Sequence, residues 1–397
     1  MSIEPNLADE EIAPARAKKK RLLLLGVLIL LVLLFCCVSV LFLRYVQKPE
    51  PLPEMIPFIE EVDYPPHYLF SIYGVDQPIG VSVSPDGERV YVAETGGEHT
   101  VKIFSRNGDL LNTIVPPNTS AGERAPANIA VDAQGRVFVS ERLQAAILVY
   151  DSEGNYLDTL LGPDLSLREY LTKHVGDLPE GSTFYYNGFR LDEGVYYQIP
   201  DEPEQVLPPP NPAVWAPLGL RFDDNGNFWI TDVMGDDHRI RMISAETIGA
   251  STWQDFSPDE FILNPSEEDG EQFTFPNSAV VDNQGRVYVA DSNNWRISVW
   301  DDKNFLYEFG GGSGENALNL PRGVWLDSKE RLHVVDAVSH DVKVYDVSGD
   351  QPFFLYVFGG LGIDDGLFHY PNDICIDSTG RLYITDRENN RVQVWSY

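Results

Sequence analysis

The chain has 397 residues, of which 61 are acidic and 29 basic, so its formal net charge is −32. This balance argues against a nucleic-acid binder, because such proteins neutralise phosphates with lysine and arginine. Hydrophobic residues make up 43% and aromatic residues 12% of the chain, which is enough apolar material for a packed core.

The first recognisable segment is an apolar run without a charge over residues 22–43. As a helix it is roughly 33 Å long, which matches a bilayer core. The basic cluster before it places the N-terminus in the cytoplasm. The sequence therefore predicts a cytoplasmic basic tail over residues 1–21 and a transmembrane helix over residues 22–43. The predicted protein is a single-pass type II protein of the cell membrane, with its large C-terminal part extracytoplasmic.

A proline-rich stretch follows over residues 44–65. Proline fixes φ and favours an extended, semi-rigid chain. This composition predicts a stalk between the membrane and the rest of the chain.

A repeated pattern organises residues 66–397. Each copy has an opening proline, an alternating strand, a tight turn, a second strand ending in an acidic residue, a polar turn and a third strand. The copies open at Pro78, Pro126, Pro217, Pro276, Pro321 and Pro371. A fourth strand follows, and four strands in such a period are typical of propeller blades. The predicted fold is all-β, a six-bladed propeller of four-stranded blades preceded by one transmembrane helix.

The two ends of this region complement each other. The sixth copy stops after its third strand, and residues 67–74 form an extra strand before the first copy. We expect this N-terminal strand to complete the last blade, because closure removes open sheet edges.

The most regular copies begin at Phe275 and at Tyr370. Both contain Asp-x-x-Gly-Arg-x-Tyr-x-x-Asp-x-x-Asn-x-Arg-x-x-Val-Trp, which resembles the NHL repeat. The resemblance covers residues 66–397 and implies a six-bladed β-propeller. The first two copies depart from it, with Glu94 and Glu141 where the strand-ending aspartate stands.

The other copies end their second strands with Asp232, Asp291, Asp336 and Asp386. A residue that recurs in most copies is expected to satisfy turn amides rather than to catalyse a reaction.

The starts of the first strands face the central channel, and their polar residues differ between copies. We predict a ligand or ion site at this channel mouth, formed by Asn128, Asn277, Arg322, Asn372 and Asp373. The alternative is that these residues fill the mouth and bind only water.

An enzymatic alternative rests on similar six-bladed propellers. Calcium-dependent hydrolases of the gluconolactonase type use oxygen ligands at this position, so calcium is the ion to consider, although a glutamate is missing here. Zinc lyases similar to NHL proteins carry histidines directly after the opening prolines, and this chain has none there. His99, His238 and His340 lie in turns too far apart to share one ion. The sequence indicates no catalytic residue.

A long insertion over about residues 163–215 carries many aromatic residues. Long connections in compact folds are commonly functional, and aromatic residues are frequent in interfaces. We predict that Tyr185, Tyr186, Tyr196, Tyr197 and Trp215 contact a protein partner. The alternative is that they pack the insertion onto the propeller. The predicted function is a membrane-anchored NHL propeller that serves as a protein- or ligand-binding scaffold.

Overall fold

The computed structural model describes residues 26–40, 64–162, 165–186, 194–208, 215–249, 261–265 and 271–397. The chain divides into two units, Met1–Leu52 and Pro53–Tyr397.

In the first unit the described part is a helix over residues 26–40. Among the described residues no helix is both long and apolar enough to cross a membrane. This finding contradicts the predicted transmembrane helix over residues 22–43, the single-span membrane contact and the type II localisation. The predicted tail over residues 1–21 and residues 44–63 of the predicted stalk lie outside the described residues.

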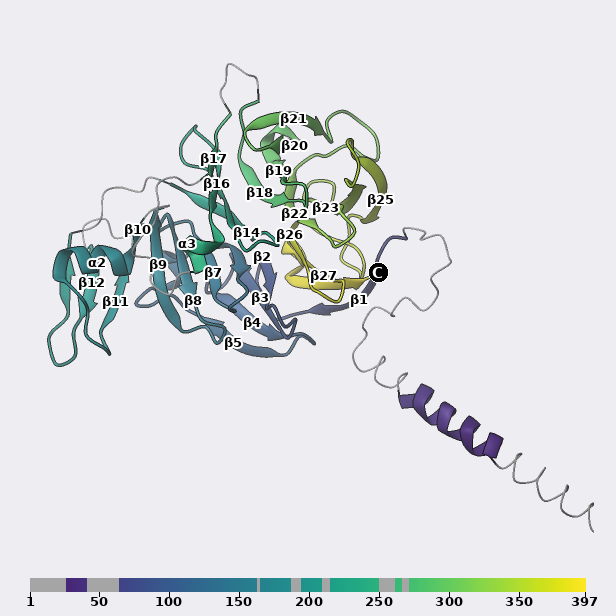
Figure 1. Ribbon diagram of the computed structural model, residues 1–397, viewed down its shortest axis with the longest axis horizontal. Coiled ribbons are helices and arrows are strands. Elements are labelled where there is room, and N and C mark those ends of the chain that lie inside the picture. Colours follow the sequence, from purple (N-terminus) through teal and green to yellow (C-terminus); the bar gives the residue numbers. More distant parts are fainter. Residues whose placement is uncertain are drawn as a thin grey trace, which may run out of the picture. The chain divides into compact units, whose positions relative to one another are not determined.

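The described strands of the second unit form seven antiparallel sheets (Figure 1). Sheet 1 consists of β2 (Pro78–Val83), β3 (Arg89–Glu94), β4 (Val101–Ser105) and β5 (Leu110–Ile114). Sheet 2 consists of β6 (Pro126–Val131), β7 (Val137–Glu141), β8 (Ala146–Tyr150), β9 (Tyr156–Gly162) and β10 (Leu165–Ser166). Sheet 3 consists of β14 (Pro217–Phe222), β15 (Phe228–Asp232), β16 (Arg239–Ile243) and β17 (Phe261–Leu263).

The remaining sheets follow the same order along the chain. Sheet 4 consists of β18 (Pro276–Val281), β19 (Arg286–Asp291), β20 (Arg296–Asp301) and β21 (Asn304–Phe309). Sheet 5 consists of β22 (Pro321–Leu326), β23 (Arg331–Asp336), β24 (Asp341–Asp346) and β25 (Phe353–Gly359). Sheet 6 consists of β26 (Pro371–Ile376), β27 (Arg381–Asp386), β28 (Arg391–Ser396) and β1 (His67–Ile72). The insertion sheet consists of β11 (Thr183–Tyr186), β12 (Val195–Gln198) and β13 (Gln205–Leu207).

Short helical segments connect some of these strands. They are α2 (Leu167–Val175), α3 (Ala245–Gly249), η1 (Ala121–Glu123), η3 (Ser292–Asn294) and η4 (Arg387–Asn389).

The turns between first and second strands follow from local chemistry. In sheet 4, Asp282 Oδ1 accepts hydrogen bonds from the main-chain N–H groups of Gln284 (2.9 Å) and Arg286 (2.8 Å). Gly285 has a φ of 86°, which glycine adopts without steric cost. The Asp-x-x-Gly sequence therefore closes the hairpin by itself.

Sheets 1 to 6 form a ring, because a hydrophobic cluster lies between each sheet and the next, including sheets 6 and 1. Between sheets 2 and 3, for example, the rings of Phe138 and Phe228 lie 5.0 Å apart. In Figure 1 the first strands β2, β14, β18, β22 and β26 gather toward the middle of this ring. Each sheet therefore buries one face against the preceding sheet and the other face against the following sheet.

The predicted sheet architecture is wrong in its count. The described residues form seven sheets, five of four strands, one of five and one of three, rather than six of four. The difference arises from the insertion, in which β11, β12 and β13 form a separate sheet. Its core contains Leu167, Leu171, Val195 and Tyr197, all buried.

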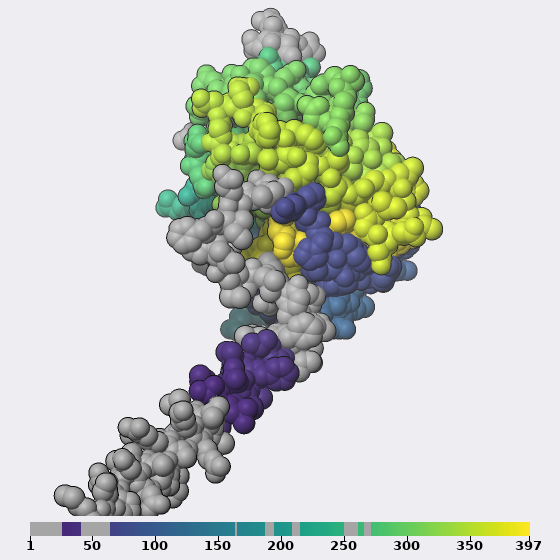
Figure 2. Space-filling view, turned by 90° about the vertical axis from the view of Figure 1, so that its right-hand side faces the viewer, coloured from purple at the N-terminus to yellow at the C-terminus, as the bar shows by residue number. Residues whose placement is uncertain are grey.

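The expected pairing of the N-terminal strand with the last strands is confirmed. β1 pairs antiparallel with β28, and His67 lies opposite Ser396. Figure 2 shows the blue N-terminal strand directly beside yellow C-terminal residues. Ile72 carries this closure into the core between sheets 6 and 1, where it is 1% exposed.

Replacing Ile72 by alanine tests how much the closing strand stabilises the ring. We expect Ile72→Ala to lower the free energy of unfolding by about 2–5 kcal/mol, because it leaves a cavity in a core. Urea unfolding followed by tryptophan fluorescence measures this loss. His67→Ala, at the exposed first position of β1, is the matched control and should change stability little. Equal effects of the two substitutions would contradict the closing role of β1.

Candidate functional site

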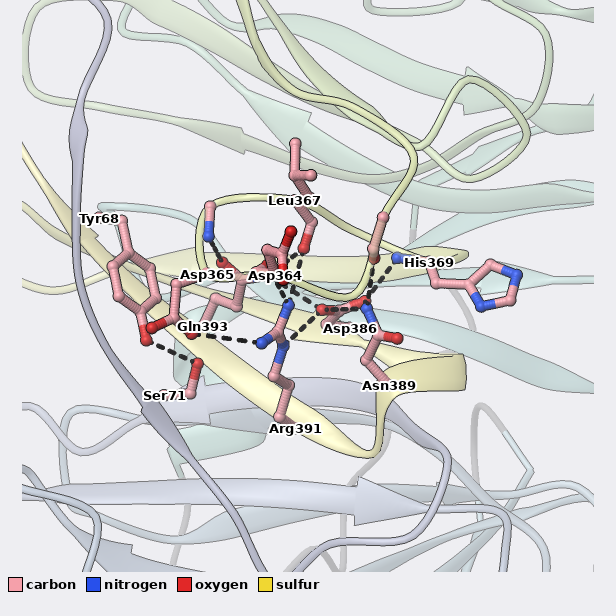
Figure 3. A network of polar contacts seen from close by, with 12 residues as sticks. Tyr68, Ser71, Asp364, Asp365, Leu367, His369, Asp386, Asn389, Arg391 and Gln393 are labelled. Carbon is pink, nitrogen blue, oxygen red and sulfur yellow. Dashed lines mark hydrogen bonds and ion pairs between the residues drawn. The ribbon is translucent and has the colours of Figure 1, made fainter.

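The acidic residues that end the second strands bind the main chain just before the opening prolines. Asp386, which is fully buried, accepts a hydrogen bond from the N–H of His369 (2.7 Å) (Figure 3). The side chains of Asn389, Arg391 and Gln393 also donate to Asp386. Asp232 accepts from the N–H of Ala216 in the same way (2.8 Å). The prediction that the recurring aspartates satisfy main-chain amides is confirmed.

Five of these six carboxylates also pair with a cation from the third strand of their own sheet. The pairs are Glu94–Lys102 (2.9 Å), Asp232–Arg241 (2.7 Å), Asp291–Arg296 (2.9 Å), Asp336–Lys343 (3.2 Å) and Asp386–Arg391 (2.7 Å). Each buried charge is therefore compensated where it lies.

Glu141 is the exception among the six. Its Oε1 accepts from the N–H groups of Ala125 (2.6 Å) and Leu143 (3.2 Å), whereas its Oε2 is buried without a hydrogen-bond partner among the described residues. Burial raises the pKa of Glu141 to about 7, and the two amide hydrogen bonds and nearby arginines only partly oppose this. The fold therefore favours the protonated acid.

We expect Glu141→Gln to stabilise the protein at pH 8 but not at pH 4.5. The folded pKa lies above the unfolded value of 4.5, so the contribution of the protonated acid is complete below pH 4.5. It is lost as the pH rises to about 7, which amounts to about 3 kcal/mol. Glutamine is neutral throughout and avoids this loss. Urea unfolding at both pH values measures the difference.

Asp386→Asn is the control for Glu141→Gln, because Asp386 has its cation in Arg391. It should destabilise the protein at pH 8. A Glu141→Gln variant that loses stability at pH 8 would show that Glu141 is ionised and paired.

Two of the predicted channel-mouth residues meet in a buried layer on the axis of the ring. Asp373 in β26 is 1% exposed, and its Oδ2 accepts from Asn128 Nδ2 in β6 (2.9 Å). The same oxygen accepts from the N–H of Val81 in β2 (3.1 Å). Asn128 in turn accepts from the N–H of Leu220 in β14 (3.0 Å). This axial network joins the first strands of sheets 1, 2, 3 and 6.

Arg221 in β14 completes the axial network and was not foreseen. Its Nη2 donates to Asp373 Oδ1 and to the carbonyl oxygen of Ile374 (3.1 Å). Its guanidinium lies over the ring of Trp325 in β22, 5.2 Å from the centroid. Burial raises the pKa of Asp373, while the charge of Arg221 opposes that rise. The one signal in the sequence is an arginine inside the first strand Pro217–Phe222, where other copies carry small or apolar residues.

Close approach of the first strands depends on glycine at the third position of β2 and of β22. A Cβ on Gly80 would lie 2.6 Å from the carbonyl oxygen of Ala127 and 2.9 Å from the Cα of Asn128. A Cβ on Gly323 would lie 2.6 Å from Asp373 Oδ1. All three distances are below van der Waals contact, so a side chain at either glycine would push the axial strands apart.

The axial residues do not fit a calcium site. Calcium takes six to eight oxygen ligands at about 2.3–2.6 Å. Both carboxylate oxygens of Asp373 and the amide oxygen of Asn128 already accept protein N–H groups. Arg221 supplies the positive charge that an ion would bring. These oxygens are therefore not available to bind calcium, as the alternative of a calcium-dependent hydrolase would require.

A double-mutant cycle tests the axial network. We expect Arg221→Met alone to lower the free energy of unfolding by about 3–5 kcal/mol, because it leaves the Asp373 carboxylate buried without its cation. Asp373→Asn alone should also destabilise. The double variant should cost less than the sum of both by about 0.5–3 kcal/mol. Strict additivity in urea unfolding would contradict a coupled ion pair.

The other three predicted mouth residues lie directly after opening prolines and are partly exposed. Asn372 Nδ2 donates to the carbonyl oxygen of Ile79 in β2 (2.6 Å). Asn277 Nδ2 donates to Ser292 Oγ (3.2 Å). Arg322 makes no hydrogen bond or ion pair within the described residues, and its Nε is buried without a partner. The predicted set thus splits into a buried axial pair, Asn128 and Asp373, and a half-exposed mouth.

The insertion aromatics fall into two groups. Tyr197 and Tyr186 pack in the core of the insertion, and Trp215 is fully buried between sheets 2 and 3. Tyr185 and Tyr196 are cross-strand partners with stacked rings, 4.7 Å between centroids. Because successive strand residues point to opposite faces, this pair lies on the face away from that core. Their role in partner binding stays a prediction.

The three turn histidines each bind the main chain before the next sheet. His238 Nδ1 accepts from the N–H of Phe275 (2.9 Å), and His340 Nδ1 accepts from the N–H of Tyr370 (2.9 Å). His99 Nδ1 bonds to the carbonyl oxygen of Arg124 (3.0 Å). They connect neighbouring sheets separately, in agreement with the expectation that they share no ion.

The geometry agrees with comparisons to known proteins. The NHL repeat family matches residues 273–300 and 368–395, which contain the first three strands of sheets 4 and 6. Over 355 residues the chain is 23% identical to NHL repeat-containing protein 2 of Gallus gallus, covering 80% of this chain and 46% of that protein. Over 128 residues it is 32% identical to Protein brain tumor of Drosophila melanogaster, covering 31% of this chain and 12% of that protein. The chain spans less than half the length of either relative.

Solved structures show the same architecture. Selenomethionine-substituted virginiamycin B lyase from Staphylococcus aureus has a TM-score of 0.50 at 12% identity, covering 83% of this chain and 98% of that chain. A structural genomics protein of unknown function from Bacteroides thetaiotaomicron also has a TM-score of 0.50, at 13% identity, covering 85% of this chain and 73% of that chain. Likeness at such identities shows the fold alone. The chain thus carries NHL repeats within a β-propeller-like fold.

Proposed function

We propose that the ring of sheets, within residues 66–397, is a scaffold that binds a protein partner on one face. This turn face carries the turns between second and third strands. The connection from β25 to β26 lies on it too, since the N–H of Gly360 donates to the carbonyl oxygen of His340 (2.9 Å). Asn389 also donates to the carbonyl oxygen of Gly362 (2.9 Å).

Large exposed apolar residues on this face carry the proposal. Trp295 is 59% exposed, Val338 46%, Leu361 65% and Ile363 76%. These four residues, here called the turn-face patch, come from sheet 4, sheet 5 and the connection to sheet 6, which are consecutive in the ring. Exposed apolar residues from neighbouring elements mark interaction surfaces.

Trp295 supports the proposal through its backbone. Its φ of 55° lies in the left-handed region, which is uncommon for a bulky residue. The equivalent turn position in sheet 6 is Asn390, a residue type that tolerates this conformation (φ 53°). A strained tryptophan exposed to solvent is expected where an interface uses it as an anchor.

Partner binding by the turn-face patch is tested with matched variants of the full chain. A partner is captured with the wild-type protein, identified by mass spectrometry, purified, and titrated against each variant. We expect Trp295→Ala and Ile363→Ser to weaken binding at least ~30-fold, as substitutions of interface anchors do. Leu110→Ser removes a residue that is 56% exposed on the outer strand of sheet 1 and should leave affinity unchanged. Unchanged affinity in both patch variants would contradict the proposal.

A further inference from the structure

We infer that the channel mouth binds a small organic oxyanion, a carboxylate or a phosphate monoester, on Arg322 with Arg142 and Arg387. This site lies in the layer above the buried axial network and is distinct from the turn-face patch. Protein-partner binding by that patch is not required for it.

The placement of the three arginines follows from the strand register. Arg322 directly follows the opening proline of β22. Arg142 and Arg387 directly follow Glu141 and Asp386, the residues that pair with the opening prolines of β6 and β26. Residues at these positions of every sheet surround the start of the channel. Arg322 belongs to sheet 5, Arg142 follows a strand of sheet 2, and Arg387 follows a strand of sheet 6. Sheet 2 lies opposite sheet 5 in the ring and sheet 6 is next to sheet 5, so the three arginines lie on different sides of the mouth.

The charge at the mouth is opposite to that of the chain. The chain has a formal net charge of −32. The residues directly after the opening prolines are Ile79, Ala127, Leu218, Asn277, Arg322 and Asn372. Those directly after the second strands are Thr95, Arg142, Val233, Ser292, Ala337 and Arg387. The charged members of both sets are all arginines, of which Arg387 pairs through Nη1 with Glu388 (3.3 Å). The remaining positive charge of Arg322 and Arg142 favours anions over metal cations at the mouth.

Arg322 is unlike the other arginines of the ring interior. Arg221, Arg241, Arg286 and Arg391 each contact a carboxylate. Arg322 contacts none within the described residues, although its Nε is buried. Burial lowers the pKa of Arg322; Tyr370 opposes this, and the charges of Arg387 and Arg142 lower the pKa further. A half-buried guanidinium without an acceptor is unfavourable, and an oxyanion would supply that acceptor.

The neighbours of Arg322 limit the ligand to a small one with a polar rim. Asn277 and Asn372 each use one amide N–H on the protein and are partly exposed. Leu218 and Ala127, which directly follow the opening prolines of β14 and β6, are buried. The planar guanidinium matches two oxygens of a carboxylate or a phosphate at once, which a lysine cannot do.

Calorimetric titration of the full chain with inorganic phosphate and with succinate tests the site. We expect one of these probes to bind with a stoichiometry of one, and the probe that binds identifies the ligand as phosphate-like or carboxylate-like. Arg322→Gln should weaken binding about tenfold or more, because it removes charge-assisted hydrogen bonds. Arg142→Gln and Arg387→Gln should weaken it less.

Arg89→Gln is the control, since Arg89 lies at the start of β3, at the far end of its sheet from the mouth, and pairs with Glu153. It should bind the anion as the wild type does, and so should the patch variant Ile363→Ser. Unchanged affinity in Arg322→Gln, or no binding of either anion by the wild type, would overturn the inference.

The folding of Arg322→Gln provides a second readout that needs no ligand. Because Arg322 has no partner within the described residues, the variant should melt at the same temperature as the wild type or higher. A clear fall in melting temperature without added anion would show that Arg322 stabilises the fold, and would also overturn the inference.

Discussion

The axial network is the constraint on which the rest of the ring depends. A single carboxylate, Asp373 of sheet 6, accepts hydrogen bonds from sheets 1, 2 and 3, and Arg221 reaches Trp325 of sheet 5. These contacts require first strands so close that Gly80 and Gly323 cannot carry a Cβ. Once the first strands are held at this distance, the outer strands can only stack their apolar faces against the neighbouring sheets. The hydrophobic clusters between successive sheets are the result.

The same network decides where function can reside. The polar atoms on the axis already form hydrogen bonds within the protein, so Asn128 and Asp373 have few groups left to bind a ligand. The strand-ending carboxylates are likewise occupied by main-chain amides and by cations of their own sheets. The groups that remain available lie one layer further out. They are the arginines at the channel mouth and the apolar residues of the turn-face patch.

Hydrophobic patterning was informative for the strands but wrong for the predicted membrane span, and it did not separate buried from exposed aromatic residues in the insertion. The apolar run over residues 22–43 resembles a membrane span, yet among the described residues no helix is both long and apolar enough to cross a membrane. The aromatic insertion resembles an interaction loop, yet Tyr197 and Trp215 are buried. Composition reports that a segment is apolar. Whether an aromatic residue such as Trp215 is buried depends on residues distant in sequence, here those of sheets 2 and 3.

The sequence by itself determined the strands, the hairpin turns and the repeating order, because each depends on residues a few positions apart, such as Asp282, Gly285 and Arg286. It also located Asn128 and Asp373 at the axis, because the repeat places every first strand there. Only the tertiary structure decided that Asp373 pairs with Arg221, 152 residues away, and that Glu141 and Arg322 lack a partner of opposite charge within the described residues. Such pairings depend on which sheets meet around a closed ring, and no local pattern encodes that distance.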